Sequence, residues 1–304
     1  MIITGATGKL GEAIVEGLLE RVPASQIGVS VREPHKAQAL SERGVRVRQG
    51  DFTDARSLHH AFDGASLVLI VSSNSLRGDM VNQHRTAIEA AQTVGCQRVL
   101  YTSHMGARLD SAFTPMIDNA ATDAILQELS GTAFTSLHNG FYAQSALQLL
   151  GGALESGQLI APEDGPVSWT AHPDLAAAAV LALTQEGELD GITPPLTGSQ
   201  ALDLADIANL ASNLTERTIT RITVTDAEYR QGLVSYGVPE EQIAVLLGLF
   251  AASRQGEFAA VDPTLERLLG RPPMTMRDVL ANHIAHWLHL VVLGVAKSST
   301  SSLF

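Results

Sequence analysis

The sequence predicts an α/β fold: a doubly wound parallel sheet with a smaller, mostly helical carboxyl-terminal lobe. Three observations lead to this prediction. Short apolar segments alternate with amphipathic helical segments through the first 140 residues. A glycine-rich turn directly follows the first of these apolar segments. Beyond residue 140 the alternation fades and helical patterns dominate.

Each strand and helix of the sheet domain rests on its own apolar pattern. Strands are expected at residues 1–4, 26–31, 45–48, 66–72, 98–102 and 134–137. The fourth reads SLVLIVS and is apolar enough to be buried on both faces, as in parallel sheets. Helices are expected at residues 9–20, 35–43, 57–62, 82–94 and 118–129. Helices of this length between strands favour parallel pairing through right-handed crossovers.

The carboxyl-terminal lobe is predicted from four helical patterns and one weak strand. The helices are expected at residues 171–183, 202–214, 226–236 and 240–250, and the strand at residues 218–223. We expect this lobe to cover the carboxyl edge of the sheet, where doubly wound folds bind ligands. The sheet domain is assigned to residues 1–140 and the lobe to residues 141–296, with some lobe segments returning to the sheet domain. The serine-rich residues 297–304 are expected to form a flexible tail.

Composition and charge exclude several classes of protein. The chain has 304 residues, with 20 Lys and Arg against 32 Asp and Glu and a net charge of −12. Because it has no basic run, binding to nucleic acid is not expected. The single cysteine, Cys96, excludes an internal disulfide and a cysteine-based metal site. His283, His286 and His289 rotate off a single helix face, so no metal site is predicted.

Apolar segments bear on location and assembly. No charged leader precedes the first strand, and the most apolar late stretch, residues 287–296, is too short to span a bilayer. We therefore expect a cytoplasmic protein with no membrane partner. The apolar segments at residues 243–250 and 287–295 are candidates for a homodimer interface.

The strongest local signal is the turn between the first strand and the first helix, which reads TGATGKLG. Gly5 permits a tight turn, Gly8 lets the backbone approach a pyrophosphate, and Gly11 lets the helix pack close to the strand. Amides at the positive end of the helix then hold the phosphates. A turn that only needs flexible residues is the alternative interpretation. The residues predicted to bind a dinucleotide here are Gly5, Ala6, Thr7, Gly8, Lys9, Leu10 and Gly11.

Residues at the ends of the next strands indicate which dinucleotide binds. Arg32 ends the second strand and Lys36 follows one turn later, and two cations suit the 2′-phosphate of NADPH. Glu33 lies between them and could accept a ribose hydroxyl, so NADH stays open, as does a merely solvated basic pair. Further cofactor-binding residues are predicted where the third, fourth and fifth strands end: Asp51, Phe52, Ser72, Ser73, Asn74 and Thr102.

Four runs of the sequence, TGATGKLG, VPASQIGVSVREPHKAQAL, VRVRQGDFTD and HNGFY, resemble the NmrA-like atypical short-chain dehydrogenases. Within this family the chain is most similar to type 2 NAD(P)H:quinone oxidoreductases and triphenylmethane reductases. The resemblance covers residues 1–280 and is dense up to Tyr142. It implies an NADPH-binding Rossmann domain and a substrate-binding lobe around a hydrophobic pocket. It also implies that the nicotinamide and the pocket lie beside Asn139, Gly140, Phe141 and Tyr142.

The chain departs from the family pattern at two places. The helix that typically carries a histidine and charged residues in these reductases reads DNAATDA at residues 118–124. Where relatives have Arg before Asn-Gly, this chain has His138. The resemblance therefore implies a conserved cofactor site with different pocket chemistry.

The Tyr-x-x-x-Lys pair of typical short-chain dehydrogenases is absent after both Tyr101 and Tyr142. Reduction of a simple ketone makes a basic alkoxide, which requires a positioned acid. Reduction of a quinone or a cationic triaryl dye does not, because the product is stabilised by aromatisation or is neutral. Such a reaction needs donor and acceptor stacked in a dry pocket. The missing pair therefore favours a planar conjugated acceptor.

Polar and aromatic residues after the fifth and sixth strands are the candidates for the chemistry. His104, Ser103 and Tyr142 are the predicted catalytic residues, with His104 donating a proton near neutral pH. The predicted substrate pocket consists of Met105, His138, Phe141 and Trp169. A structural imidazole and ordinary core packing are the alternatives for the histidines and the aromatic residues.

Three hypotheses for function follow. The first is an NADPH-dependent reductase that transfers hydride to a quinone or similar planar acceptor. The second is a regulator that senses NAD(P) without turnover and binds a partner protein. The third is a tailoring oxygenase that acts on a polycyclic quinone through its reduced form. Oxidation of NADPH in the presence of a quinone separates the first from the second.

Overall fold

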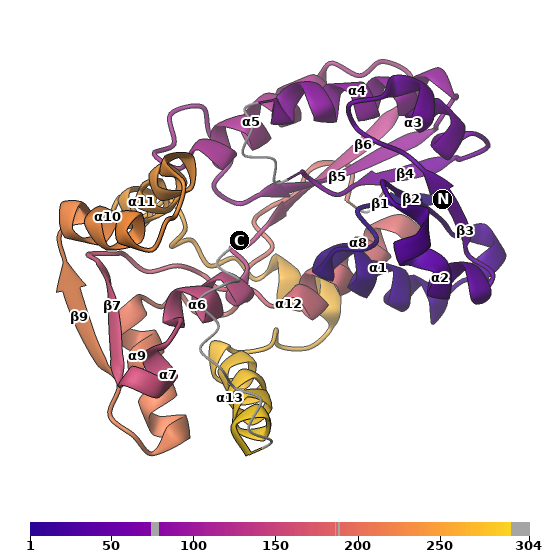
Figure 1. Ribbon diagram of the computed structural model, residues 1–304. Coiled ribbons are helices and arrows are strands. Elements are labelled where there is room, and N and C mark those ends of the chain that lie inside the picture. The colour runs from indigo at the N-terminus through magenta and orange to yellow at the C-terminus, as the bar shows by residue number, and fades with distance from the viewer. Residues whose placement is uncertain (74–78, 186, 188, 293–304) are drawn as a thin grey trace.

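The computed structural model describes residues 1–73, 79–185, 187 and 189–292, and its largest sheet is parallel throughout (Figure 1). The strand order is β3-β2-β1-β4-β5-β6-β8. Because β1 neighbours both β2 and β4, the winding direction reverses at β1, as in a doubly wound fold. The predicted fold class is confirmed. The strands are β1 (Ile2–Thr4), β2 (Gly28–Val31), β3 (Arg46–Gln49), β4 (Leu67–Ile70), β5 (Arg98–His104), β6 (Ala133–Asn139) and β8 (Gly191–Ile192).

Helices cover both faces of this sheet, because successive strand residues point to opposite sides. Val68 and Val99 pack toward one layer of helices, and their neighbours Leu69 and Leu100 pack toward the other. One layer contains α3 (Ala55–Phe62), α4 (Met80–Thr93) and α5 (Thr114–Gln127). The other contains α1 (Lys9–Leu19), α2 (Gln38–Glu42), α8 (His172–Thr184) and α12 (Thr264–Leu269).

Element boundaries differ from the predictions at several places. The helix predicted at residues 35–43 begins as a 3-10 turn, Pro34–Ala37, before α2. Strands β5 and β6 continue two residues beyond the predicted ends and include His104 and Asn139. Helix α5 begins earlier than predicted, at Thr114, with a proline in its first turn. Both strand extensions carry residues that were placed in the site.

Much of the second half of the chain forms a lobe that the carboxyl ends of β5 and β6 point toward (Figure 1), whereas α8, β8 and α12 belong to the sheet and its helix layers. The core of the lobe contains Phe141, Trp169, Phe250 and Phe258. The strands β7 (Gln158–Pro162) and β9 (Thr220–Val224) pair in parallel. The helices are α6 (Ala143–Leu150), α7 (Ala153–Ser156), α9 (Leu204–Thr215), α10 (Asp226–Ser235), α11 (Glu240–Arg254) and α13 (Met276–Val292). The sequence patterns did not predict α6, α7, β7, β8, α12 or α13.

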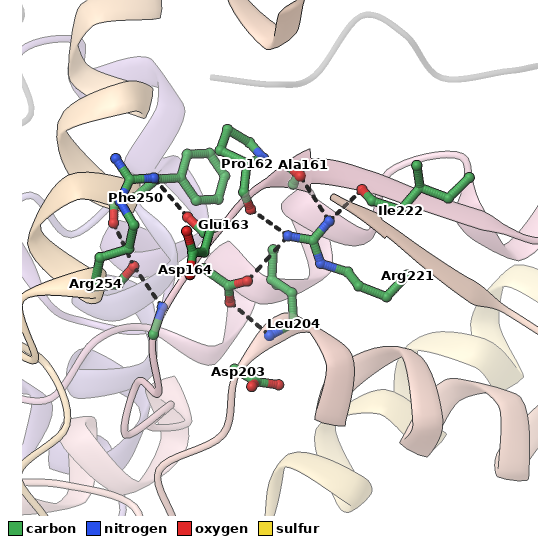
Figure 2. A network of polar contacts seen from close by, with 12 residues as sticks. Ala161, Pro162, Glu163, Asp164, Asp203, Leu204, Arg221, Ile222, Phe250 and Arg254 are labelled. Carbon is green, nitrogen blue, oxygen red and sulfur yellow. Dashed lines mark hydrogen bonds and ion pairs between the residues drawn. The ribbon is translucent and has the colours of Figure 1, made fainter. Parts of the chain in front are cut away.

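A buried polar network joins the strands and helices of this lobe (Figure 2). Arg221 on β9 donates to the carbonyl oxygens of Ala161 and Pro162 on β7, and to the Asp164 carboxylate at 3.1 Å. The other oxygen of Asp164 accepts the backbone N–H of Leu204 at 2.8 Å, at the start of α9. One arginine and one carboxylate therefore tie β7, β9 and α9 together.

Several predicted features lie outside the described residues. These are Asn74, the end of the apolar stretch at residues 293–296, and the tail at residues 297–304. Among the helices that the structure describes, none has the length and apolar character needed to cross a membrane.

Candidate functional site

The glycine-rich turn places the start of α1 tightly against the end of β1. Gly5 has a φ of 62°, which L side chains rarely adopt, and its carbonyl accepts the N–H of Gly8 at 2.9 Å. A Cβ added to Gly11 would lie 2.2 Å from the Gly5 carbonyl oxygen. Gly8 is the N-cap of α1 and brings no side chain to cap it. The first amides of α1 are therefore available to an anion at the carboxyl edge of the sheet.

The two cations predicted for the 2′-phosphate lie at the end of β2 and differ in their surroundings. Arg32 is exposed, and its carbonyl accepts from the side chain of Gln49 at 3.3 Å. Lys36 donates to the Glu33 carboxylate at 2.6 Å, and this bond lowers the pKa of Glu33. A phosphate at this site would therefore compete with Glu33 for Lys36.

Asp51 and Phe52 follow β3, and both side chains contact other residues of the protein. Asp51 accepts from the backbone N–H of Thr53 at 2.9 Å and from its hydroxyl at 2.8 Å, so its carboxylate closes a local turn. These bonds lower the pKa of Asp51, with a smaller contribution from Arg32. Phe52 contacts His84 edge to face. This places the Asp51 carboxylate near the Arg32 cation, at the predicted cofactor-binding edge of the sheet.

Ser72 and Ser73, which follow β4, are held by side chains of β5 and α4. Thr102 accepts the N–H of Ser72 at 2.8 Å, and His84 Nε2 accepts the N–H of Ser73 at 2.9 Å. His84 is fully buried on α4, and burial lowers its pKa to about 4. Its Nδ1 lies 3.2 Å from the Tyr101 hydroxyl. A neutral imidazole therefore fixes the segment that leads into the predicted ribose site.

Sequence reasoning missed His84, although a signal for it exists. It shares the apolar stripe of α4 with Met80, Ala87, Ile88 and Ala91, which are all buried. A histidine on such a stripe must bind a polar partner inside the fold, because a buried polar group without one is costly. The partner itself could not be identified from the sequence.

Asn139 ends β6 with a buried amide oxygen that finds no hydrogen-bond partner among the described residues. Its neighbour must be glycine, because a Cβ on Gly140 would lie 2.2 Å from the Thr170 hydroxyl oxygen. A buried acceptor without a donor is destabilising unless a ligand supplies one. The carboxamide of a nicotinamide ring carries such N–H donors. The residues at this edge therefore fit a nicotinamide dinucleotide.

His104 lies at the end of β5 against aromatic rings of the lobe. Its ring centroid is 5.1 Å from that of Phe141 and 5.6 Å from that of Phe258. Burial, with a smaller effect from His138, lowers the pKa of His104 to about 3. The expectation that His104 releases a proton near neutral pH is therefore wrong. Its Nδ1 accepts the N–H of Gly106 at 3.0 Å, so the neutral ring carries its hydrogen on Nε2.

The residues predicted to wall the substrate pocket lie deeper than expected. Phe141 and Trp169 are only 7% and 4% exposed and belong to the core of the lobe. The indole of Trp169 donates to the Leu202 carbonyl at 2.9 Å, and Met105 Sδ accepts from the Ser168 hydroxyl. These side chains are part of the packed core, and Phe113 and Phe258, which the sequence did not single out, complete the aromatic cluster around Phe141.

Tyr142 lies at the start of α6 with its ring 4.5 Å from that of His172. Burial raises the pKa of Tyr142, and a hydrogen bond with Asn139 offsets part of this effect. The phenol is therefore un-ionised at neutral pH. Ser103 is also buried, and its hydroxyl donates to Asp123 on α5 at 3.0 Å.

One cavity of the protein lies away from the predicted site. This cavity, of about 530 Å³, lies at the opposite, amino edge of the sheet, beside Met1, Gly28, Arg46 and Leu67. Ligands of doubly wound folds bind at the carboxyl edge, so this cavity is not assigned to the coenzyme. In the described part of the chain, no group of three His, Cys, Asp or Glu side chains is arranged to hold a metal ion.

Comparison with known proteins links the chain to NAD(P)H-binding oxidoreductases. Residues 5–149 match a family model described as NAD(P)H-binding. The chain is 34% identical to quinone oxidoreductase 2 of Escherichia coli, over 92% of this chain and 97% of that protein. It is 31% identical to the NAD(P)H azoreductase of Xenophilus azovorans, over 94% of this chain and 98% of that one.

Solved structures show the same relationship. The crystal structure of the Escherichia coli NADPH-dependent quinone oxidoreductase with NADPH has a TM-score of 0.86 at 33% identity, covering 95% of this chain and all of that one. The triphenylmethane reductase of Citrobacter sp. with NADP(H) has a TM-score of 0.85 at 29% identity, covering 93% and 99%.

Proposed function

The chain belongs to the NAD(P)H-binding, NmrA-like family of oxidoreductases, and from this premise we propose that it is an NADPH-dependent reductase of quinones or similar planar conjugated acceptors. Two of its similar proteins are named for quinone reduction and azo reduction. Both of those acceptor classes are flat and conjugated. We infer that this chain reduces acceptors of the same class, and that they bind beside His104.

The residues that would hold the coenzyme follow the carboxyl edge of the sheet. The amides of residues 8–11 would bind the pyrophosphate, and Arg32 with Lys36 the 2′-phosphate. Ser72, Ser73 and Thr102 would lie beside the ribose. When bound, the coenzyme supplies a hydride to the acceptor. The protein's part is to orient the two reactants and exclude water.

One observation carries the proposal. His104 and Asn139 are register partners at the ends of β5 and β6. Asn139 offers a buried, unpartnered acceptor for a carboxamide, and His104 offers a neutral N–H donor for a developing negative charge on a substrate oxygen. A hydride donor and a carbonyl acceptor would therefore each find one matched group at adjacent strand ends.

The proposal is tested by mixing the protein with NADPH and one acceptor, which is menadione, benzoquinone or a cationic triphenylmethane dye. Oxidation of NADPH is measured as the loss of its absorbance. We expect the wild type to turn over these acceptors. The variant His104→Phe should reduce quinones more slowly than the wild type and should still bind NADPH. NADPH binding without turnover across this panel would contradict the reductase and favour the sensing regulator. Oxygen uptake coupled to a polycyclic quinone would favour the oxygenase.

A further inference from the structure

A buried carboxylate lies directly beneath the proposed substrate site. Asp123 on α5 is 5% exposed and accepts three hydrogen bonds. Ser136 donates to one oxygen at 2.5 Å, and Ser103 and His138 donate to the other at 3.0 and 2.9 Å. Neither Lys nor Arg is among its partners in the part of the chain that the structure describes. His138 is the only basic side chain among its hydrogen-bond partners there.

The site needs a proton source, because hydride transfer to a quinone leaves a quinolate anion. His104 cannot be this source, since it is neutral and its loss of Nε2–H would leave an imidazolate. Tyr142 is a weakened acid because burial raises its pKa. The hydroxyl hydrogen of Ser103 is committed to Asp123. These three groups, which the sequence placed in catalysis, therefore stabilise or position rather than protonate.

His138 meets the requirements of a proton donor. It lies on β6 directly opposite Ser103 and one residue before Asn139. Its side chain is 14% exposed, so it can exchange protons with solvent. Its Nε2 is bound to Asp123, and its Nδ1 makes no hydrogen bond with the described residues.

We propose that His138, held in place by Asp123, delivers the proton that completes reduction of the quinone. This inference rests on the proposed function. The coenzyme supplies a hydride, that is, two electrons and one proton, and the quinone becomes a quinolate. The Nδ1–H bond of the His138 imidazolium breaks, an O–H bond forms on the quinolate, and neutral His138 regains a proton from solvent. The sum is quinone plus NADPH plus one proton, giving quinol plus NADP⁺.

The titratable groups around His138 define the pH dependence to be expected. They are Asp123 from α5, which binds its Nε2, and His104 from β5, which is neutral at pH 7 because burial lowers its pKa to about 3. A general acid must carry its proton to act, so the quinone rate should fall as pH rises.

The test compares the wild type with His138→Gln and Asp123→Asn, using menadione as acceptor across pH 5–9. Both variants should bind NADPH as the wild type does. Their kcat should be lower by about 100-fold near neutral pH, the lower end of a general acid's contribution, and His138→Gln should lose the fall at high pH. His286→Gln, on the exposed side of α13, is the matched control. Reduction of a cationic triphenylmethane dye, which needs no proton, should be spared in both variants.

The outcomes separate the two proposals. If the wild type turns over menadione and His138→Gln keeps its rate and pH profile, the proton donor is not His138, and the reductase assignment stands. Equal losses with menadione and the dye would likewise overturn the inference, because they would indicate a structural role. A wild type that binds NADPH but reduces no acceptor would overturn the reductase itself, and the proton delivery with it.

Discussion

At the scale of single residues, Lys36 is shared between an acid of the protein and a phosphate of the proposed coenzyme. Glu33 binds Lys36 at 2.6 Å, whereas Arg32 has no such acid partner among the described residues. The side chains of Glu33 and Lys36 are both about half exposed, so their pair contributes little to stability and can exchange partners. Glu33 therefore acts on coenzyme affinity more than on folding.

Changing these residues should separate the two coenzymes. Glu33→Gln frees Lys36, so we expect the Kd for NADPH to fall by about 3- to 10-fold, with the Kd for NADH unchanged. Arg32→Ala should raise the Kd for NADPH by about 10-fold or more. Fluorescence titration with each coenzyme measures both effects. Arg56→Ala, an exposed arginine on α3, serves as the control. Equal shifts for NADPH and NADH would show that these residues do not bind the 2′-phosphate.

At the scale of elements, the approach of α1 to β1 depends on a single missing side chain. Gly11→Ala would place a Cβ 2.2 Å from a backbone oxygen, which no side-chain rotation can relieve. We expect a loss of about 1–3 kcal/mol in the free energy of unfolding and a loss of coenzyme binding. Thermal unfolding and NADPH titration measure these. Gly232→Ala in α10 is the matched control, because nothing lies within 4 Å of its added Cβ and the change should stabilise the helix. Normal coenzyme binding by Gly11→Ala would contradict the assigned loop.

His84 couples α4 to the end of β4, and this coupling should be sensitive to acid. Its folded pKa of about 4 lies below the ordinary value of 6.5, so the unfolded chain takes up the proton first. Stability from this group is present above pH 6.5 and is lost as pH falls toward 4, by roughly 2–3 kcal/mol. His104, His172 and His283 act in the same direction, so the wild-type slope contains the effect of all four histidines.

His84→Gln isolates the contribution of His84 in this window. The variant should be less stable at pH 7, and the gap to the wild type should narrow as pH is lowered from 6.5 to 4. Urea unfolding at a series of pH values measures this effect. A gap that does not depend on pH would show that His84 is not held neutral.

The same elements show what a sequence can predict. Apolar strand cores and the glycine turn are readable because burial and backbone geometry are local properties. The last residues of β5 and β6 escape prediction because they are polar, and their partners, such as Asp123 for Ser103 and His138, come from another element. Phe258 reaches His104 only through the folded lobe. The sheet and its glycine turn were therefore predictable, whereas the neutral state of His104 and the burial of His84 were not.

At the scale of the whole molecule, the buried apolar side chains of the described residues form three clusters. Two lie on the faces of the sheet, and the third lies in the lobe and supplies the aromatic rings beside His104. Glu257 joins the lobe to the loop after β5 by accepting from Ser111 and from the backbone N–H of Ala112. The substrate side of the site therefore depends on the integrity of the lobe, and the coenzyme side depends on the sheet.

The Asp164–Arg221 network makes this dependence testable. Both side chains are nearly buried, at 12% and 11% exposure. Arg221→Met leaves the Asp164 carboxylate without its cation and removes the side-chain donor to the carbonyls of Ala161, Pro162 and Ile222, so we expect a loss of about 3–5 kcal/mol at pH 7. Asp164→Asn keeps an acceptor for Leu204 and should cost less. Arg230→Met breaks an exposed ion pair with Glu240 and should cost about 0–1 kcal/mol.

The pH dependence of Arg221→Met gives the decisive measurement. Burial already raises the pKa of Asp164, and removal of Arg221 should raise it further. A carboxyl whose folded pKa lies above its unfolded value stabilises the fold below the unfolded pKa and loses this effect as pH rises through the folded pKa. The destabilisation should therefore shrink as pH is lowered from 7 toward 4. Menadione turnover should be lost before NADPH binding as this variant is warmed, because the lobe opens first. Simultaneous loss of both would show that lobe and sheet unfold as one unit.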